Sequence, residues 1–244
     1  MSRYFIEVSY KGTLYAGFQS QQNANAIQDE VEKALGIYFK DTFQLTGSSR
    51  TDAGVHANQN FFHLDFEFPE MIVWQKVVYH LNAILPADIV IRQIFAVDEN
   101  RHSRFDALYR TYEYSIYATK DPFLADRAFF YPYELDIDLL NQAASLIKEN
   151  KDFESFSKRN SQVFTYLCTI LISEWEQKDK TLVYRVSGNR FLRGMVRGLV
   201  GTMLKVGRKK TSLEEFTNII DSHNPSLVDF SVPPQGLSLV KVAY

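Results

Sequence analysis

The sequence predicts an α+β protein made of two related domains of split β-α-β type, each with an antiparallel sheet. The main observation is an order of strand, helix, two strands, helix and strand over residues 3–97 that repeats approximately in the second half. The 244 residues suffice for two domains of ordinary size. No low-complexity segment separates the halves, and we therefore expect two domains, residues 1–104 and 105–244, that form a fixed or modestly hinged pair.

Hydrophobic periodicity defines the elements of the first half. Alternation over residues 3–10 predicts a strand. Helical spacing predicts one helix over residues 26–38, with Asn25 as its N-cap, and another over residues 72–84, which ends before Pro86. Three further strands are expected over residues 43–46, 60–66 and 89–97.

The second half has the same kinds of signal. Residues 163–175 and 181–187 predict a hairpin, and Ser212 with Glu215 forms a capping box that opens a helix over residues 211–222. The other elements expected here are strands over residues 109–117 and 237–244 and helices over residues 138–148 and 191–206.

Composition narrows the class of protein. The formal net charge of −2 does not suggest a nucleic-acid binder, yet residues 185–210 hold eight basic side chains and no acid, which predicts one positive face. The single cysteine, Cys168, lies in an apolar run and is expected to be a buried strand residue in a reducing compartment. No signal peptide or stretch of membrane-spanning length is present, so we expect a soluble cytoplasmic protein without membrane contact.

The segment 47–57 (Gly-Ser-Ser-Arg-Thr-Asp-Ala-Gly-Val-His-Ala) is the strongest functional signal. Ala53 and Gly54 allow a sharp turn after Asp52 that would lift its carboxylate out of the fold. Arg50 is close enough in sequence to hold that carboxylate ionised through charge and forked hydrogen bonds. The alternative interpretation is an Asp-x-Gly turn whose charges are merely solvated.

A second signal lies on and just before the helix expected over residues 191–206. Three arginines at spacings of three and four share one face of this segment beside a strip of glycines, and this pattern fits close approach of phosphate groups. The alternative is tight helix-on-sheet packing with a solvated basic edge. These residues are Arg190, Arg193 and Arg197 with Gly194, Gly198 and Gly201.

Two other patterns bear on the kind of site. Tyr112 and Tyr114 share a face of the strand 109–117, where they either pack in the core or stack on bases. His56 and His63 lack the further ligands that a metal site needs, and no glycine-rich phosphate-binding loop is present. The sequence therefore predicts neither a metal nor a cofactor.

Several motifs occur together along almost the whole chain. They are Tyr10 with residues 15–19 (Tyr-Ala-Gly-Phe-Gln), residues 50–56, residues 102–107 (His-Ser-Arg-Phe-Asp-Ala), residues 110–112 (Arg-Thr-Tyr), residues 153–156 (Phe-Glu-Ser-Phe), residues 191–197 (Phe-Leu-Arg-Gly-Met-Val-Arg) and residues 236–240 (Gly-Leu-Ser-Leu-Val). In this order they resemble the tRNA pseudouridine synthase A (TruA) family. The resemblance implies two α+β domains that flank a central catalytic cleft. It also implies a homodimeric isomerase that converts uridine to pseudouridine in the anticodon stem-loop of tRNA, at positions 38–40, without cofactor or metal.

The resemblance also implies roles for residues. Asp52 matches the essential aspartate, Tyr112 the active-site tyrosine, and Arg50 and Arg197 the arginines near the aspartate. Asp52 would act at the ribose, either as a nucleophile at C1′ or as a base at C2′. The target uridine would be flipped out, with Tyr112 stacked on it; Arg50 could instead fill the space that the base leaves. Substrate phosphates would be held by Arg190, Arg193 and Arg197.

Three positions depart from the common family pattern: Ser49 replaces glycine, Phe18 replaces tryptophan, and Arg193 stands where a histidine or another residue is found. None of them removes a catalytic group. Two other classes of function remain open at this point, a non-catalytic RNA-binding protein with the same platform and an α+β protein with an incidental basic helix. The intact set of Asp52, Arg50 and Tyr112 favours the isomerase, because a binding module does not need an acid beside an arginine.

Overall fold

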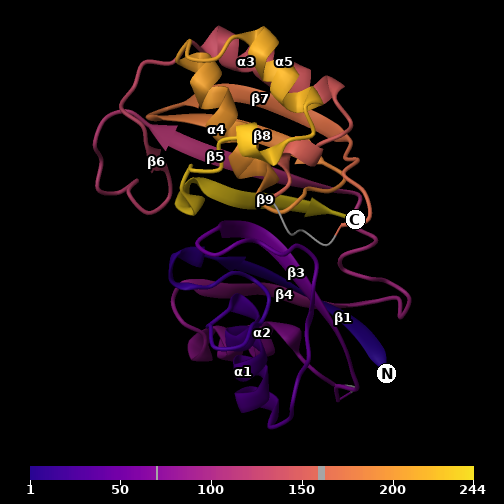
Figure 1. The fold of residues 1–244 in the computed structure, drawn as a ribbon. Coiled ribbons are helices and arrows are strands. Elements are labelled where there is room, and N and C mark those ends of the chain that lie inside the picture. Colours follow the sequence, from indigo (N-terminus) through magenta and orange to yellow (C-terminus); the bar gives the residue numbers. More distant parts are fainter. Residues whose placement is uncertain (70, 159–162) are drawn as a thin grey trace. The chain divides into compact units, whose positions relative to one another are not determined.

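A computed structural model describes residues 1–69, 71–158 and 163–244 (Figure 1). The chain divides into two compact units, residues 1–108 with 239–244 and residues 109–238. Both units mix helices with mostly antiparallel strands, which confirms that part of the predicted fold class. The expected domain boundary at residue 104, and the relation of the halves as split β-α-β repeats, stay predictions.

The first unit is built on a sheet in the order β4-β1-β3-β9. Strands β1 (Ser2–Tyr10), β3 (His56–Phe66) and β4 (Ile89–Val97) pair antiparallel, with β1 in the centre of the three. The short strand β2 (Thr46–Gly47) pairs with β3. The last strand in the chain, β9 (Leu237–Ala243), contributes its residues from 239 onward to this unit.

Helices α1 (Ile27–Phe39) and α2 (Trp74–Ile84) belong to the same unit and begin and end close to the predicted positions. The predicted cap of α1 is wrong: Ala26 is the N-cap, and its N–H donates to Asp29 Oδ2 at 2.9 Å. Asn25 donates instead to Glu30 Oε1. The carboxylate of Asp29 in the first turn thus satisfies the N–H of the cap residue and lies favourably at the positive end of the helix dipole.

The second unit has an antiparallel arrangement β5-β8-β7, with β5 (Tyr109–Tyr117), β8 (Thr181–Gly188) and β7 (Ile170–Lys178). The short strand β6 (Phe129–Phe130) runs parallel to β5. The hairpin β7-β8 is confirmed, but β7 begins at Ile170 and not at residue 163. The preceding segment bonds elsewhere, since the Cys168 N–H donates to Lys151 O at 2.9 Å.

Cys168 is buried, as expected, but it precedes β7 and is not the strand residue that was predicted; burial raises the pKa of its thiol to about 11. A thiol held neutral in this way is a poor nucleophile. The structure therefore supports its interpretation as a packing residue.

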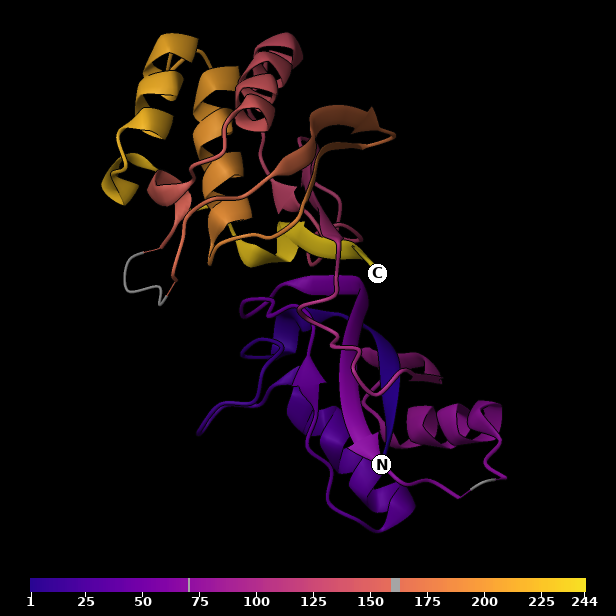
Figure 2. The same ribbon diagram turned by 90° about the vertical axis from the view of Figure 1, so that its right-hand side faces the viewer.

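Helices α3 (Ile137–Glu149), α4 (Met195–Gly207) and α5 (Leu213–Asp221) lie side by side in the second unit (Figure 2). The capping box between Ser212 and Glu215 is confirmed. Helix α4 begins four residues later than predicted. Its N-cap, Gly194, has φ +73°, a left-handed conformation that glycine adopts readily and that interrupts a helix running from residue 191.

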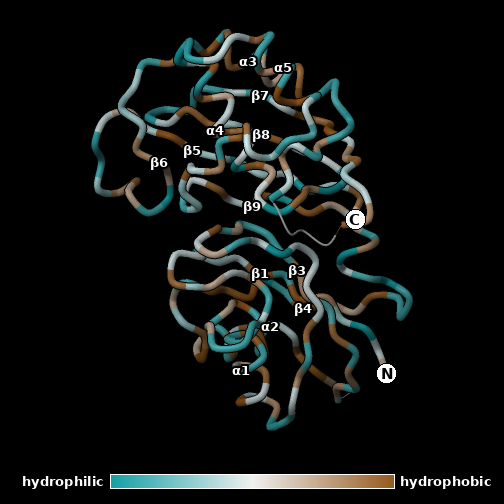
Figure 3. The backbone as a smooth tube through the Cα atoms, viewed as in Figure 1, coloured by the Kyte–Doolittle hydropathy of each residue, from teal (hydrophilic) through white to brown (hydrophobic). Residues whose placement is uncertain are grey.

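Hydrophobic and hydrophilic residues alternate along the elements of both units (Figure 3), as expected for helices and strands that bury one side. The strand β1 is an exception, because residues on both of its faces are buried, among them Phe5 and Ile6; on one face, Tyr4 packs edge-on against Phe68 and lies 5.2 Å from Trp74 of α2 between ring centroids. Among the described residues, none of the helices combines the length and the apolar character that crossing a membrane requires.

One buried histidine makes the stability of the first unit dependent on pH. Burial lowers the pKa of His63 to about 4, and the charges of His102 and Arg3 act in the same direction. The unfolded chain therefore takes up a proton between about pH 6.5 and pH 4 that the folded chain excludes. His63 contributes its full stabilisation above pH 6.5, and this contribution is lost as the pH falls toward 4.

We predict that the free energy of unfolding, measured with urea, decreases from pH 7 to pH 4 and that His63→Gln makes this decrease smaller. His80→Gln is the matched control, because His80 is exposed on α2, and it should keep the wild-type profile. Coincident profiles for His63→Gln and the wild type would contradict the assignment.

Candidate active site

The Asp52 loop connects β2 to β3 in the first unit. The turn expected there is present: the Val55 N–H donates to Asp52 O at 3.1 Å, and Gly54 has φ +78°. Asp52 itself is half-buried, whereas Thr51 and Val55 on either side are buried. The loop thus holds its backbone inside the fold and leaves one carboxylate partly open to solvent.

A chain of buried hydrogen bonds anchors the loop to strands β1 and β3. The Tyr10 hydroxyl lies 2.7 Å from Thr51 Oγ1, next to Asp52 in the sequence. Asn60 Nδ2 donates to Tyr10 Oη at 3.2 Å and to Ser49 O at 2.9 Å. Because a carbonyl oxygen only accepts, the second bond fixes which end of the Asn60 amide faces the loop.

Asn60 is a functional candidate that sequence reasoning missed. It is 0% exposed and comes from a strand in which apolar residues dominate the following positions. An amide at a buried strand position indicates a specific polar partner, since burying it without one is costly. That signal was available in the sequence, but the partner, Ser49, was not.

Backbone hydrogen bonds also anchor the loop to the segment from Gly12 to Phe18. The Phe18 N–H donates to Thr51 O at 3.1 Å, and the Gly54 N–H donates to Tyr15 O at 3.3 Å. A Cβ atom on Gly12 would lie 2.0 Å from Val55 O, so only glycine permits this approach. The motif at residues 15–19 is therefore explained as a support for the Asp52 backbone.

His56 also belongs to this support. The Gly12 N–H donates to His56 Nδ1 at 3.0 Å, so this nitrogen carries no proton and serves as an acceptor. This contact gives His56 a structural role that requires no metal.

Arg50 is exposed, and the structure does not show the forked hydrogen bonds expected between it and Asp52. Over residues 1–69, 71–158 and 163–244, no hydrogen bond or ion pair joins these two side chains. The role of Arg50 toward Asp52 stays a prediction.

The other predicted site residues lie in the second unit. Tyr112 of β5 is half-buried, and its ring meets that of Phe191 edge-on at a centroid distance of 5.2 Å. Tyr114 on the same strand is 0% exposed and donates its hydroxyl to Pro233 O at 2.8 Å. Of the two tyrosines that share this face, Tyr114 is thus a core residue, whereas Tyr112 keeps part of its surface exposed, and its role at the site stays a prediction.

Arg197 is the only one of the three predicted arginines that lies within α4. Its Nε donates to Val232 O at 2.8 Å. Arg190 and Arg193 precede the helix, half-buried and exposed respectively, so the shared helical face expected for the three arginines is wrong. The left-handed Gly194 between them is the physical reason.

The strip of glycines is not open to a ligand either. A Cβ on Gly198 would lie 2.8 Å from the ring of Phe230, and one on Gly201 would lie 2.2 Å from Asp229 O. The segment 228–230 of this chain thus packs directly on the backbone of α4. Tight packing, the alternative that the sequence left open, explains these two glycines.

The strongly positive face predicted over residues 185–210 is wrong, because several of its basic side chains form ion pairs with acids of the same unit. Arg185 pairs with Glu113 at 2.7 Å, and although burial alone would raise the pKa of Glu113, its hydrogen bonds to Arg185 and Lys178 lower it below the ordinary value. Two lysines pair with acids from distant parts of the chain. These pairs are Lys205 with Asp229 at 3.2 Å and Lys209 with Asp136 at 3.1 Å.

Arg208 is engaged as well, since its guanidinium lies 3.7 Å from the centroid of the Tyr133 ring. Four of the eight cations are therefore engaged with an acid or an aromatic ring within the unit. The other four are Arg190, Arg193, Arg197 and Lys210, of which Arg197 bonds to a backbone carbonyl.

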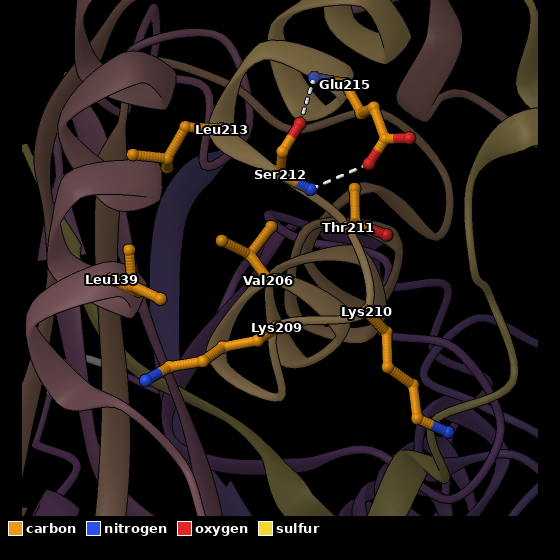
Figure 4. A pocket seen from close by; sticks show the side chains of 8 residues that line it. All are labelled: Leu139, Val206, Lys209, Lys210, Thr211, Ser212, Leu213 and Glu215. Carbon is orange, nitrogen blue, oxygen red and sulfur yellow. Dashed lines mark hydrogen bonds between the residues drawn. The ribbon is translucent and has the colours of Figure 1, made fainter.

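A hollow of about 330 Å³ lies between α3, α4 and α5 (Figure 4). Its wall includes Lys209, Lys210 and the capping-box pair Ser212 and Glu215. None of the predicted catalytic residues lines it. We therefore assign it no part in the candidate site.

One group of potential metal ligands occurs in the part of the chain that the structure describes. Asp152, Glu154 and His223 bring one ligand atom each within 4.8 Å of one another. His223 Nδ1 lies 3.2 Å from Glu154 Oε2, and all three side chains are substantially exposed. A surface contact between one histidine and two carboxylates accounts for this arrangement, and neither His56 nor His63 belongs to it.

Comparison with known proteins decides the family. Bacteroides fragilis has a tRNA pseudouridine synthase A that is 41% identical to this chain over 245 residues, covering 100% of the chain and 97% of the relative. The chain belongs to the tRNA pseudouridine synthase A family. This is a family of isomerases, as the motifs in the sequence implied.

Two further relatives with the same name support the assignment. That of Azobacteroides pseudotrichonymphae is 38% identical over 244 residues (100% of this chain and 97% of the relative), and that of Staphylococcus aureus is 35% identical over 243 residues (98% and 90%). The sequence model of a family described as tRNA pseudouridine synthase matches residues 143–244. This match covers most of the second unit and the last strand.

The hydrogen bond between Tyr10 and Thr51 allows a test of how the loop is held. Tyr10→Phe removes one buried hydroxyl and leaves Thr51 Oγ1 without this partner, so we predict a loss of about 1–3 kcal/mol in the free energy of unfolding. Faster hydrogen exchange should accompany it at the amides of Gly54 and Val55. Tyr79→Phe is the control, because Tyr79 is 74% exposed on α2. Unchanged exchange in the loop would contradict the support that we describe.

Proposed function

We propose that this protein isomerises uridine to pseudouridine at positions 38–40 in the anticodon stem-loop of tRNA. The observation that carries the proposal is the half-buried Asp52 on a loop fixed by Tyr10 and Asn60, in a chain of the tRNA pseudouridine synthase A family. An aspartate placed in this way is suited to act repeatedly at one position of a bound ribose, because its backbone does not need to reorganise.

The reaction replaces the bond between C1′ and N1 of uridine by a bond between C1′ and C5. Asp52 would start it from the sugar side, and two routes are open. In the first, its carboxylate attacks C1′ and displaces the base, which turns and bonds through C5 as the carboxylate leaves. In the second, it removes the proton at C2′, the bond to N1 breaks, and the proton returns once C5 has bonded to C1′.

Both routes end with the loss of the proton at C5, and we propose that Tyr112 serves this step. Its half-buried ring beside Phe191 provides an aromatic surface on which a flipped uracil could stack, and its hydroxyl could relay the proton to solvent. Arg50 and Arg197 would hold Asp52 ionised and oriented, or Arg50 would fill the space that the flipped base leaves.

The phosphates of the substrate would be bound by Arg190, Arg193 and Arg197, and neither a metal nor a cofactor is needed for this chemistry. Because three of the eight basic residues in this region pair with acids and a fourth, Arg208, contacts the Tyr133 ring, only four remain for counterion release, and we expect binding to depend only moderately on salt. We further propose that the protein works as a homodimer in the cytoplasm, where its tRNA substrate would be found.

Asp52→Ala should abolish turnover and leave tRNA binding intact. We expect a decrease of at least about 10³-fold in tritium release from tRNA labelled at uridine C5, since the carboxylate acts in the chemical step. Asp41→Ala, which changes an exposed aspartate of the same unit, should behave as the wild type. Tritium release at the wild-type rate by Asp52→Ala would refute the mechanism. Binding without release by the wild type would favour a non-catalytic RNA-binding protein.

Tyr112→Phe should separate stacking from proton transfer. Because the ring remains, the affinity for tRNA measured by filter binding should stay at the wild-type value, while the rate of tritium release falls about 10²-fold. Tyr112→Ala should lower both quantities. Tyr131→Phe in the same unit serves as the control. A loss of affinity in Tyr112→Phe would mean that the hydroxyl binds the substrate and does not move the proton.

A further inference from the structure

The turn at residues 101–106 follows β4 in the first unit and presents an aromatic ring to solvent. Phe105 is 76% exposed, and Arg104 beside it is also exposed. This turn contains most of the motif at residues 102–107, to which neither the Asp52 loop nor the chemistry proposed above gives a role. A single exposed phenylalanine needs no explanation by itself, but Phe105 is held in place by the structure of its turn.

Hydrogen bonds within the turn fix its shape. The His102 N–H donates to Asp106 Oδ2 at 2.9 Å, and the Asp106 N–H donates to His102 O at 3.1 Å. The Arg104 N–H donates to His102 Nδ1 at 3.1 Å. Phe105 thus projects from a closed and ordered turn, and its exposure does not come from a loose loop.

Ser103 fastens the turn to the strands that carry the Asp52 loop. It is 0% exposed, its Oγ donates to Thr46 O at 3.1 Å, and the Tyr244 hydroxyl donates to Ser103 O at 2.6 Å. Thr46 is the first residue of β2 and precedes Asp52 by six residues. Six residues of extended chain span at most about 20 Å, so the turn lies within reach of one RNA arm bound at Asp52.

The surroundings of the ring favour a base as its partner. The His102 ring lies 4.3 Å from the Phe105 ring between centroids, and the Arg104 guanidinium lies 5.8 Å from it. The turn holds two arginines and one aspartate, with Arg101 Nε 3.5 Å from Asp106 Oδ2. An aromatic face beside cationic groups matches an unpaired base next to its phosphate, because bases stack on aromatic rings and phosphates are attracted by guanidinium groups.

We propose that Phe105 stacks on an unpaired base of the bound tRNA and so positions the anticodon arm for the Asp52 loop. This inference rests on the function proposed above. It assigns substrate binding to a side chain outside the loop and outside the second unit.

The test compares Phe105→Ala, Phe105→Tyr and the wild-type protein in binding an unmodified tRNA transcript that carries uridines at positions 38–40. Phe105→Ala should weaken binding about 5- to 150-fold, the range for loss of one stacked base, whereas Phe105→Tyr should stay within about twofold. Since phenylalanine carries no charge, the slope of log Kd against log salt should be the same for Phe105→Ala and the wild type. Phe123→Ala, at an 80% exposed phenylalanine of the second unit, is the matched control.

Phe105→Trp adds a direct readout of stacking. After subtraction of the wild-type signal from Trp74 and Trp175, its emission should decrease when tRNA is added. Unchanged affinity in Phe105→Ala, with a wild-type protein that binds and isomerises tRNA, would overturn the stacking proposal alone. A wild-type protein that binds no tRNA would overturn both proposals. A change of sedimentation coefficient in Phe105→Ala, together with lost affinity, would show that the ring contacts a second copy and would also overturn it.

Discussion

The hydrogen bond between the Tyr10 hydroxyl and Thr51 is the interaction on which the candidate site depends. A loop that exposes a carboxylate must still satisfy its own backbone donors and acceptors, because burying them without partners is costly. Here β1 supplies Tyr10, β3 supplies Asn60, and the segment before α1 supplies the N–H of Phe18. Three separate parts of the chain thus converge on the residues beside Asp52, and the loop needs no help from its own exposed side chains.

The second unit concentrates basic residues in one region, and their mutual repulsion would lower the stability of the fold. Like charges at close range raise the energy of the folded state, and pairing within the unit limits this cost. Three of the basic residues between 185 and 210 form ion pairs with Glu113, Asp136 and Asp229. The segment containing Asp229 also covers the glycines of α4, so neutralisation and packing are achieved by the same stretch of chain. Among the cations that remain is Arg190, which directly precedes Phe191, the residue whose ring contacts Tyr112.

The sequence predicted those features that depend on local periodicity and failed where distant contacts decide. Strand β5, the two helices of the first unit and the capping box of α5 were found because spacing and side-chain chemistry determine them. The start of α4 was missed, since a glycine is compatible with a helix until its φ is known. The positive face was overestimated because its acidic partners lie up to 73 positions away, at Asp136 and Glu113. For the site, residue types predicted Asp52, which stays a prediction, but only the fold shows that Asn60 supports its loop.

The contacts of Ser49 and Phe18 explain how the structure accommodates these two departures from the family pattern. Ser49 offers its carbonyl oxygen to Asn60, and every residue type has that group, so this contact does not require glycine. Phe18 stacks on Phe62 at a centroid distance of 4.3 Å and on Tyr10 at 5.7 Å. Its ring also occupies the space in which a side chain on Gly47 would lie, since a Cβ there would be 2.4 Å away. A larger tryptophan would extend the same stack, and the smaller ring keeps the support of Tyr10 intact because the contact depends on an aromatic face and not on a polar group.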